Sequence, residues 1–325
     1  MMTPKQNALE SIYGGKPEYV PLSHEDVQLA GMASLDQEAP LMRNGTDIFG
    51  VPWVATKEGS IPKPGFMLFD DVTEWEKHVK IPDVASMDFK AMAEAEINRR
   101  PPSDGEEKLV EIMDGLGPFQ RLVSFMTFEE ALCALVMEPQ ACMDFFEAVT
   151  EYKIAYINKS IDAYNPDIYC LGDDNATARG LFMSPETFRK LIKPYWARMA
   201  EAVTKRGVLF NIHDCGKCED IIPDMVEIGV SFWQSAQPMN DLAGILDKYR
   251  GQLAVEGGWD SSGPPSYIGA DEEMIRAEVR RCLTEYKKPG FFLWPSIINE
   301  RGNSVFVGDD RLGALKDEWL KYRMF

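Results

Sequence analysis

The sequence predicts an α/β fold: a single (β/α)8 barrel of the TIM type, covering residues 1–325, with an irregular N-terminal extension. From residue 109 onward, short apolar runs alternate with amphipathic helical segments, a pattern typical of parallel strands joined by helices. Seven or eight such units favour a closed barrel over an open sheet with helices on both faces. A barrel can use a chain of 325 residues as one domain.

The first 105 residues are irregular and rich in Pro, Gly and Trp. We expect them to contribute only the first strand of the barrel, at "YVPLSHED" (19–26). The segment "DIFGVPWVAT" (47–56) is expected to form a hairpin or an extended stretch. A short capped helix is expected at 70–84, followed by a loop at 99–107 that contains "PPSDG".

The remaining elements follow in alternation. The apolar runs expected as strands are 109–117, 167–174, 208–215, 231–237, 252–260 and 291–297, and the expected helices lie near 127–137, 139–164, 184–207, 219–229, 240–250, 271–287 and 309–322. The helix at 184–207 has the clearest boundaries, because Ser184 can cap it, Pro185 suits its first turn and Gly207 can end it. Pro194 predicts a kink within it.

Composition excludes several classes of function. No stretch approaches 18 consecutive apolar residues, so we expect no membrane span. The N-terminus lacks the apolar core of a signal peptide, and the six cysteines are scattered, so we expect a cytoplasmic enzyme without a disulfide framework. The net charge of −18 repels phosphate backbones, which argues against nucleic acid as a partner.

Polar or reactive residues follow most of the apolar runs. They are His24, Glu25 and Asp26; Asp114; Asp173, Asp174 and Asn175; His213 and Cys215; Gln234 and Gln237; and Glu256 and Asp260. Taken singly, each could be a helix cap or a polar loop residue. Because the carboxyl ends of all barrel strands open on one face, the set as a whole predicts an active site there.

The segment "LFNIHDCGKCED" (209–220) carries the most specific chemistry. Side chains alternate along a strand, so a His-x-Cys pair on extended backbone points both groups to the same side and could bind one metal ion. Cys218, three residues further on, could supply a third ligand. Two alternatives remain open from the motif alone: a buried histidine beside inert thiols, or a His–Cys nucleophile pair.

Three segments resemble the uroporphyrinogen decarboxylase superfamily, and more closely its cobalamin-dependent methyltransferase branch. They are "LGDDNATARGLFMSPETFRKLIKPYWARM" (171–199), "HDCGKCEDIIPDMVEIGVSFWQSAQPMNDL" (213–242) and "EGGWDSSGP" (256–264). The resemblance covers nearly the whole chain, with "HxCG" and "GGWD" as its most specific parts. It implies a TIM barrel with an N-terminal extension.

The resemblance also implies a cofactor and a partner. Members of this branch bind zinc and transfer a methyl group between a small substrate and the cobalt of a corrinoid that a separate protein carries. His213 and Cys215 match the zinc ligands. Relatives that use methylated thiols often take a third ligand, a cysteine, from the loop after the last strands, whereas here that loop, "FFLWPSIINERGNS" (291–304), has none. The similarity is closer to enzymes of anaerobes that demethylate methoxylated aromatics, with Glu256 as the expected third ligand and Cys218 as the alternative.

The alternative function is that of the decarboxylases themselves, which are lyases that act without a metal. Their substrate carries eight carboxylates, which family members hold with an arginine-rich segment near the N-terminus. The first arginine here is Arg43, and the matching stretch, residues 19–40, is acidic. Repulsion would oppose binding of such a polyanion. We therefore favour the methyltransferase function, for which the resemblance implies a small methylated substrate, an aromatic methyl ether.

The remaining site residues are assigned by their places after the strands. Asp173, Asp174 and His24 are expected to orient the substrate or deliver a proton. Substrate-binding residues are expected to be Trp53, Trp233, Gln234, Trp259 and Asp260, although tryptophans of a barrel also often belong to its core.

Overall fold

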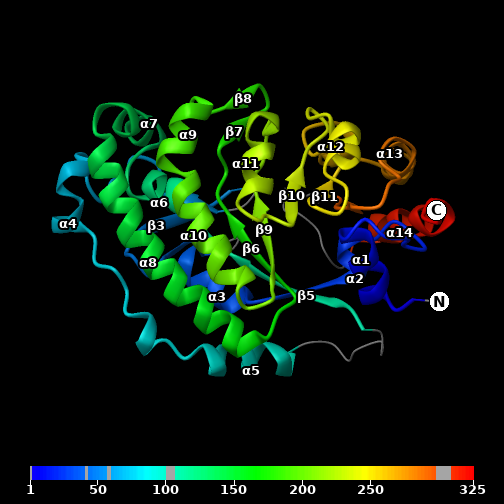
Figure 1. The fold of residues 1–325 in the computed structure, drawn as a ribbon, viewed down its shortest axis with the longest axis horizontal. Coiled ribbons are helices and arrows are strands. Elements are labelled where there is room, and N and C mark those ends of the chain that lie inside the picture. The colour runs from blue at the N-terminus through cyan, green and yellow to red at the C-terminus, as the bar shows by residue number, and fades with distance from the viewer. Residues whose placement is uncertain (1, 41–42, 57–59, 100–106, 298–308) are drawn as a thin grey trace.

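The computed structural model describes residues 2–40, 43–56, 60–99, 107–297 and 309–325. Within these ranges, seven parallel strands form one sheet with the order β1-β5-β6-β9-β10-β11-β12 (Figure 1). The strands are β1 (Val27–Ala30), β5 (Leu109–Asp114), β6 (Ile168–Gly172), β9 (Leu209–His213), β10 (Phe232–Ala236), β11 (Ala254–Gly257) and β12 (Phe291–Leu293). A parallel bridge between Leu22 and Leu293 brings the segment before β1 beside β12, so the sheet curls toward closure.

The predicted closed barrel of eight strands is therefore wrong in its strand number, although the curled parallel sheet is barrel-like. The first strand was also misplaced. The Asp26 carboxylate accepts hydrogen bonds from the Leu22 N–H and the Tyr19 hydroxyl, both at 2.8 Å, which folds residues 23–26 into the short helix α2. The chain becomes extended in the sheet only from Val27.

Helices surround the sheet, and α8 and α10 run side by side on its outer face (Figure 1). The α-helices are α1 (Pro4–Ile12), α2 (Ser23–Asp26), α3 (Met32–Glu38), α4 (Trp75–His78), α5 (Phe89–Arg99), α6 (Pro118–Phe125), α7 (Phe128–Met137), α8 (Pro139–Tyr164), α9 (Pro185–Leu191), α10 (Lys193–Thr204), α11 (Ile222–Glu227), α12 (Leu242–Lys248), α13 (Glu272–Glu285) and α14 (Asp310–Tyr322). Short 3-10 turns are η1 (Val72–Glu74), η2 (Val84–Ser86), η3 (Glu219–Ile221) and η4 (Pro264–Ser266). None of the helices in the described part of the chain has both the length and the apolarity needed to cross a membrane.

The helices from 127 onward lie close to their predicted positions. The expected kink in the segment 184–207 is a break between α9 and α10, with Pro194 in the first turn of α10. Ser184 caps α9 through its side chain, as predicted. The loop predicted at 99–107 lies largely outside the described residues.

An apolar floor closes the amino end of the sheet. Ala8 and Ile12 of α1 pack there against the first inward-facing residues of the strands, namely Val27, Leu109, Ile168, Phe232, Ala254 and Phe292. Because side chains alternate, the residue two positions further on each strand points inward again. On β5, β6, β10 and β11 these are Glu111, Cys170, Gln234 and Glu256, all buried, and Asn211 of β9 joins them. The interior above the floor is therefore a polar layer.

A buried ion network joins the N-terminal extension to the sheet. Arg121 of α6 contacts Glu38 at 2.6 Å and Asp47 at 2.9 Å, while Lys153 of α8 contacts Glu38 at 3.1 Å and Asp114 at 2.8 Å, and all five side chains are buried. Removing one partner of such a network typically costs about 3–5 kcal/mol, because a buried charge is left uncompensated. The extension also contains the antiparallel sheet of β2 (Gly45–Thr46), β3 (Pro52–Ala55) and β4 (Ser60–Pro62), at the predicted extended segment.

Candidate metal centre

Three potential metal ligands meet at the carboxyl end of the sheet. One ligand atom each of Asp174, His213 and Cys215 lies within 4.8 Å of the other two. His213 is the last residue of β9, and its register partner on the neighbouring strand β6 is Gly172, two residues before Asp174. The adjacency of β6 and β9 therefore brings a carboxylate to the His-x-Cys motif.

Cys215 is held at the centre of this group by its backbone. Its N–H donates to Asp174 Oδ1 at 2.8 Å, and its sulfur lies 3.5 Å from His213 Nε2. The next residue, Gly216, has φ +92°, and a Cβ there would come within 2.8 Å of backbone atoms of Ala176 and Thr177. The loop after β9 thus packs against the hairpin of β7 (Ala176–Thr177) and β8 (Gly180–Leu181), which requires a glycine after Cys215.

A backbone irregularity adds a hydroxyl to the group. Ser235 has φ +65°, rare for a residue with a side chain, and the register of β10 against β11 shifts between Gln234 and Ala236. The Ser235 hydroxyl lies 3.0 Å from Cys215 Sγ. Ser235 was not predicted from the sequence, because a bulge of this kind has no signal in the apolar pattern.

Asp174 is oriented by two hydrogen bonds. Its Oδ1 accepts the Cys215 N–H, and its Oδ2 accepts from Gln120 Nε2 of α6 at 2.9 Å. A carboxylate held in this way keeps further lone pairs for a cation. Gln120 was also not predicted from the sequence, because it lies inside α6, a helix that the apolar pattern did not predict.

His213 contacts the polar layer through its other ring nitrogen. Nδ1 lies 2.8 Å from Gln234 Oε1, and Gln234 Nε2 donates to Glu256 Oε2 at 2.8 Å. Glu256 is therefore not grouped with Asp174, His213 and Cys215, because β10 separates its strand β11 from β9. This placement favours Asp174 over Glu256 as the third donor.

Electrostatics of the site favour a bound cation. Burial, together with the charge of Asp174, raises the pKa of the Cys215 thiol well above its ordinary value. A thiolate beside a carboxylate is disfavoured unless positive charge compensates both groups, and a metal ion supplies that charge. Carboxylate oxygen, imidazole nitrogen and cysteine sulfur are all ligands of zinc, so the donor set fits this ion with a fourth position left open.

Two other predicted residues face away from the centre. Asp173 is fully buried; its Oδ1 accepts the Gln120 N–H at 2.8 Å, and its Oδ2 accepts from Trp196 Nε1 at 2.7 Å. It points toward the helices because it follows the inward-facing Gly172. The Cys218 thiol is buried among backbone carbonyls of residues 214–216, with Cys215 O at 3.4 Å.

The three predicted tryptophans are all buried. Trp53 donates to Asp47 at 3.0 Å within the N-terminal extension, Trp233 points outward and donates to Asp214 O at 3.0 Å, and Trp259 donates to Ser266 at 2.9 Å. Trp53 and Trp233 therefore belong to the core in this structure, whereas Trp259 also lines a small pocket beside the centre. The tryptophan that contacts the centre is Trp294, whose ring meets His213 edge to face at a centroid distance of 5.7 Å.

The remaining predicted residues take varied places. Burial lowers the pKa of His24, in α2, to about 4, so its ring is neutral near pH 7. Asp260 accepts from the Ser262 N–H at 3.2 Å in the loop after β11. Gln234 lies within the polar layer, where it contacts His213 and Glu256 directly.

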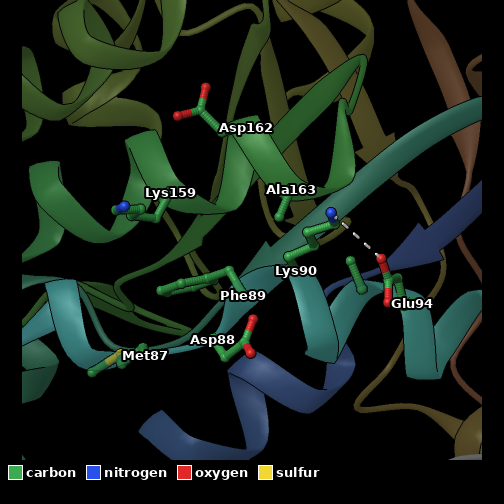
Figure 2. A pocket seen from close by; sticks show the side chains of 9 residues that line it. Met87, Asp88, Phe89, Lys90, Glu94, Lys159, Asp162 and Ala163 are labelled. Atoms are coloured by element: carbon green, nitrogen blue, oxygen red, sulfur yellow. Dashed lines mark ion pairs between the residues drawn. The ribbon is translucent and has the colours of Figure 1, made fainter.

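A larger groove lies near the amino end of β6, and Figure 2 shows the side chains that line it. It has a volume of about 480 Å³ and runs between α5 and the last turns of α8, with Phe89, Lys90, Lys159 and Asp162 among its lining residues. Because α8 ends just before the amino end of β6, this groove is separate from the candidate metal centre. Lys90 pairs with Glu94 at 4.0 Å and Asp162 with Arg206 at 2.6 Å, so the lining of the groove carries charges of both signs.

Comparison with known proteins agrees with this architecture. A methyltransferase from Methanosarcina mazei superposes with a TM-score of 0.64 and 15% sequence identity, covering 99% of each chain, which establishes a shared fold. A putative sugar phosphate isomerase/epimerase from Anabaena variabilis aligns over 64% of this chain and 65% of its own at 12% identity, with a TM-score of only 0.32. No curated protein matches the sequence.

The family model described as uroporphyrinogen decarboxylase (URO-D) matches residues 84–296. This range is more than half of the chain, and it includes β5 to β12 with Asp174, His213 and Cys215. The chain therefore belongs to the uroporphyrinogen decarboxylase family.

Proposed function

We propose that this protein is a zinc-dependent methyltransferase. It would move a methyl group from a small methylated substrate, an aromatic methyl ether, to the cobalt of a corrinoid held by a partner protein. The observation that carries the proposal is the meeting of Asp174, His213 and Cys215 at the carboxyl end of the sheet, where barrel enzymes have their active sites. The name of the Methanosarcina mazei methyltransferase, whose fold this chain shares, is consistent with it.

Asp174, His213 and Cys215 would hold the zinc ion. When bound, zinc would supply a Lewis acid that stabilises negative charge on the ether oxygen as the methyl group departs. Gln120 keeps the Asp174 carboxylate in place, and the Ser235 hydroxyl can donate to the Cys215 sulfur. These contacts prepare the donor set before any metal arrives.

Apolar side chains beside the centre suit an aryl methyl ether. Trp294 offers a ring against His213. Leu29 lies two residues beyond Val27 of the floor and beside Glu111 in the sheet register, faces inward by alternation, and is 43% exposed. Met113, two residues beyond Glu111, faces the same way and is half-buried. An apolar wall binds an aromatic ring and excludes water from the departing methyl group.

A partner protein is proposed because the sequence has no fingerprint of a cofactor-binding loop. The exposed face of α7 supports a docking surface near the mouth: Phe128, Val136 and Met137 are 42%, 76% and 73% exposed. The ring of Phe128 lies 4.7 Å from that of Phe182, which directly follows β8, so α7 reaches the rim of the site. Val136 and Met137 are adjacent, and we take them as the apolar patch of the proposed docking surface.

The rival function is decarboxylation of a polycarboxylate without metal, which the description of the matching family model favours. It needs cations at the mouth. The first arginine, Arg43, is exposed and pairs with Asp36, and the stretch before it is acidic. The charge distribution therefore favours the methyl ether over the polyanion.

The test is a methyl-transfer assay with purified protein, cobalt(I) corrinoid and a panel of methoxyarenes, methanol, methylamines and methylthiols. The proposal expects methylation of the corrinoid from a methoxyarene, dependent on zinc and abolished in Cys215→Ser. Turnover of a porphyrinogen by metal-free protein, with no methyl transfer, would establish the rival instead.

A further inference from the structure

The side-chain amide of Gln234 has a defined orientation in the polar layer. Two groups converge on its oxygen: the Cys170 thiol donates to it at 3.6 Å, and His213 Nδ1 lies 2.8 Å from it. Burial, with the nearby charge of Glu111, raises the pKa of Cys170 well above its ordinary value, so Cys170 is a thiol that can donate. The amide nitrogen faces Glu256 Oε2 at 2.8 Å.

Glu256 fixes the same orientation from the other side. An ionised carboxylate only accepts hydrogen bonds, so it requires the NH₂ group of Gln234 to face it. Burial raises the pKa of both Glu256 and Glu111, and the charge of Glu256 raises that of Glu111 further.

The orientation of Gln234 determines where His213 carries its proton. A carbonyl oxygen at 2.8 Å from Nδ1 requires an N–H at that nitrogen. A neutral imidazole with its proton on Nδ1 has a free lone pair on Nε2, the atom that lies 3.5 Å from Cys215 Sγ. With the amide reversed, Nδ1 would accept and Nε2 would carry the proton, which excludes a metal ion.

We propose that Gln234, held by Glu256 and Cys170, is a positioning residue that fixes His213 as the Nδ1–H tautomer and keeps Nε2 ready for metal. The use of this tautomer rests on the proposed metal centre, whereas the tautomer itself is a property of the metal-free protein. Gln234 and Glu256 thus serve the centre through His213 without contacting substrate. Partners of metal-binding histidines typically change metal affinity about 10- to 100-fold when removed.

The experiment is nitrogen-15 NMR of histidine-labelled, zinc-free protein near neutral pH. The chain has only three histidines, so the His213 signals are assigned by their loss in His213→Gln. Wild-type protein is expected to show the His213 proton on Nδ1 alone. In Gln234→Leu the Nε2–H tautomer is expected to appear, and the zinc dissociation constant is expected to rise about 10- to 100-fold.

The matched control is Gln237→Leu, which removes an amide from the same strand end. Gln237 accepts from the Gly216 N–H at 2.8 Å and donates to the Ser261 hydroxyl, rather than to His213, so the tautomer should not change. A wild-type proton on Nε2, or a pure Nδ1–H tautomer in folded Gln234→Leu, overturns the inference. The wild-type spectrum alone decides if that variant does not fold.

The outcomes also separate this inference from the proposed function. A protein that has the Nδ1–H tautomer but takes up no zinc retains the inference and rejects the function. Zinc-dependent methyl transfer by a protein whose His213 carries its proton on Nε2 before metal uptake rejects the inference alone.

Discussion

Asp173 offers a quantitative test of whether its carboxyl group is structural. The group is fully buried, and burial raises its pKa from the ordinary 3.8 to about 7, against the lowering effect of its hydrogen bonds from Gln120 and Trp196. The substitution Asp173→Asn keeps the shape and removes the titration. It should therefore change how the free energy of unfolding depends on pH.

The sign and size follow from linkage between proton binding and folding. A carboxyl group whose pKa is higher in the folded state stabilises the protein fully below the unfolded pKa, and this stability is lost as pH rises toward the folded pKa. Each tenfold change in a protonation equilibrium corresponds to about 1.4 kcal/mol, so the complete loss is about 4 kcal/mol. A measurement between about pH 5.5 and 8.5 covers only the upper part of this titration. Over that interval about 2 kcal/mol of the stabilisation should be lost.

The assay is urea unfolding of wild type and Asp173→Asn at both pH values. At the lower pH we expect the free energy of unfolding of the variant to be smaller than that of wild type. The variant lacks one hydrogen-bond acceptor, typically worth about 1 kcal/mol. At the higher pH the difference should shift by about 2 kcal/mol in favour of the variant, with zinc content unchanged. A difference that is the same at both pH values, or a loss of zinc, would show that the carboxyl group is not the buried structural group described here.

Three further predictions concern the site and its surroundings. Cys215→Ser should lose most bound zinc while Cys218→Ser retains it, because only the Cys215 thiol lies beside the other donors. Elemental analysis of the purified variants measures this, and equal loss of zinc in both would point to Cys218 as a ligand. Trp294→Ala should raise KM for a methoxyarene about fivefold, as expected for losing roughly 1 kcal/mol of ring contact, with zinc content intact. An unchanged KM would remove this ring from the substrate wall. The double variant Val136→Glu with Met137→Glu should bind the corrinoid protein at least about tenfold more weakly in calorimetry, with zinc content unchanged. Unaltered binding would place the docking surface elsewhere.

The order of strands explains what the sequence could predict of the metal centre. Alternation along β9 placed His213 and Cys215 together, and this part of the prediction needs no knowledge of other strands. The choice between Asp174 and Glu256 depends on which strand lies beside β9. Both follow apolar runs and look equivalent in the sequence, but β6 is the direct neighbour of β9, whereas β10 intervenes before β11.

The fold was predictable where apolar runs are regular. It was less predictable where hydrogen bonds of single side chains determine whether a segment forms a strand or a helix. The strands β5, β6, β9, β10, β11 and β12 of the large sheet coincide with predicted runs of apolar residues. The first strand was placed too early because the Asp26 carboxylate turns residues 23–26 into a helix, which no apolar pattern reveals. The same limit applies to Trp233, within β10, and to Trp294, directly after β12. The side of the sheet that each tryptophan faces depends on the register of its strand, which the apolar pattern does not give.

X-ray absorption at the zinc edge of the reconstituted protein tests the central claim most directly. The account predicts about one zinc ion per chain with a single sulfur ligand at roughly 2.3 Å and nitrogen and oxygen ligands at about 2.0–2.2 Å. In Asp174→Asn the zinc should bind more weakly, whereas Glu256→Gln should keep the same set of ligand atoms. A first shell with two sulfurs, or protein that takes up no zinc, would contradict a centre built from Asp174, His213 and Cys215.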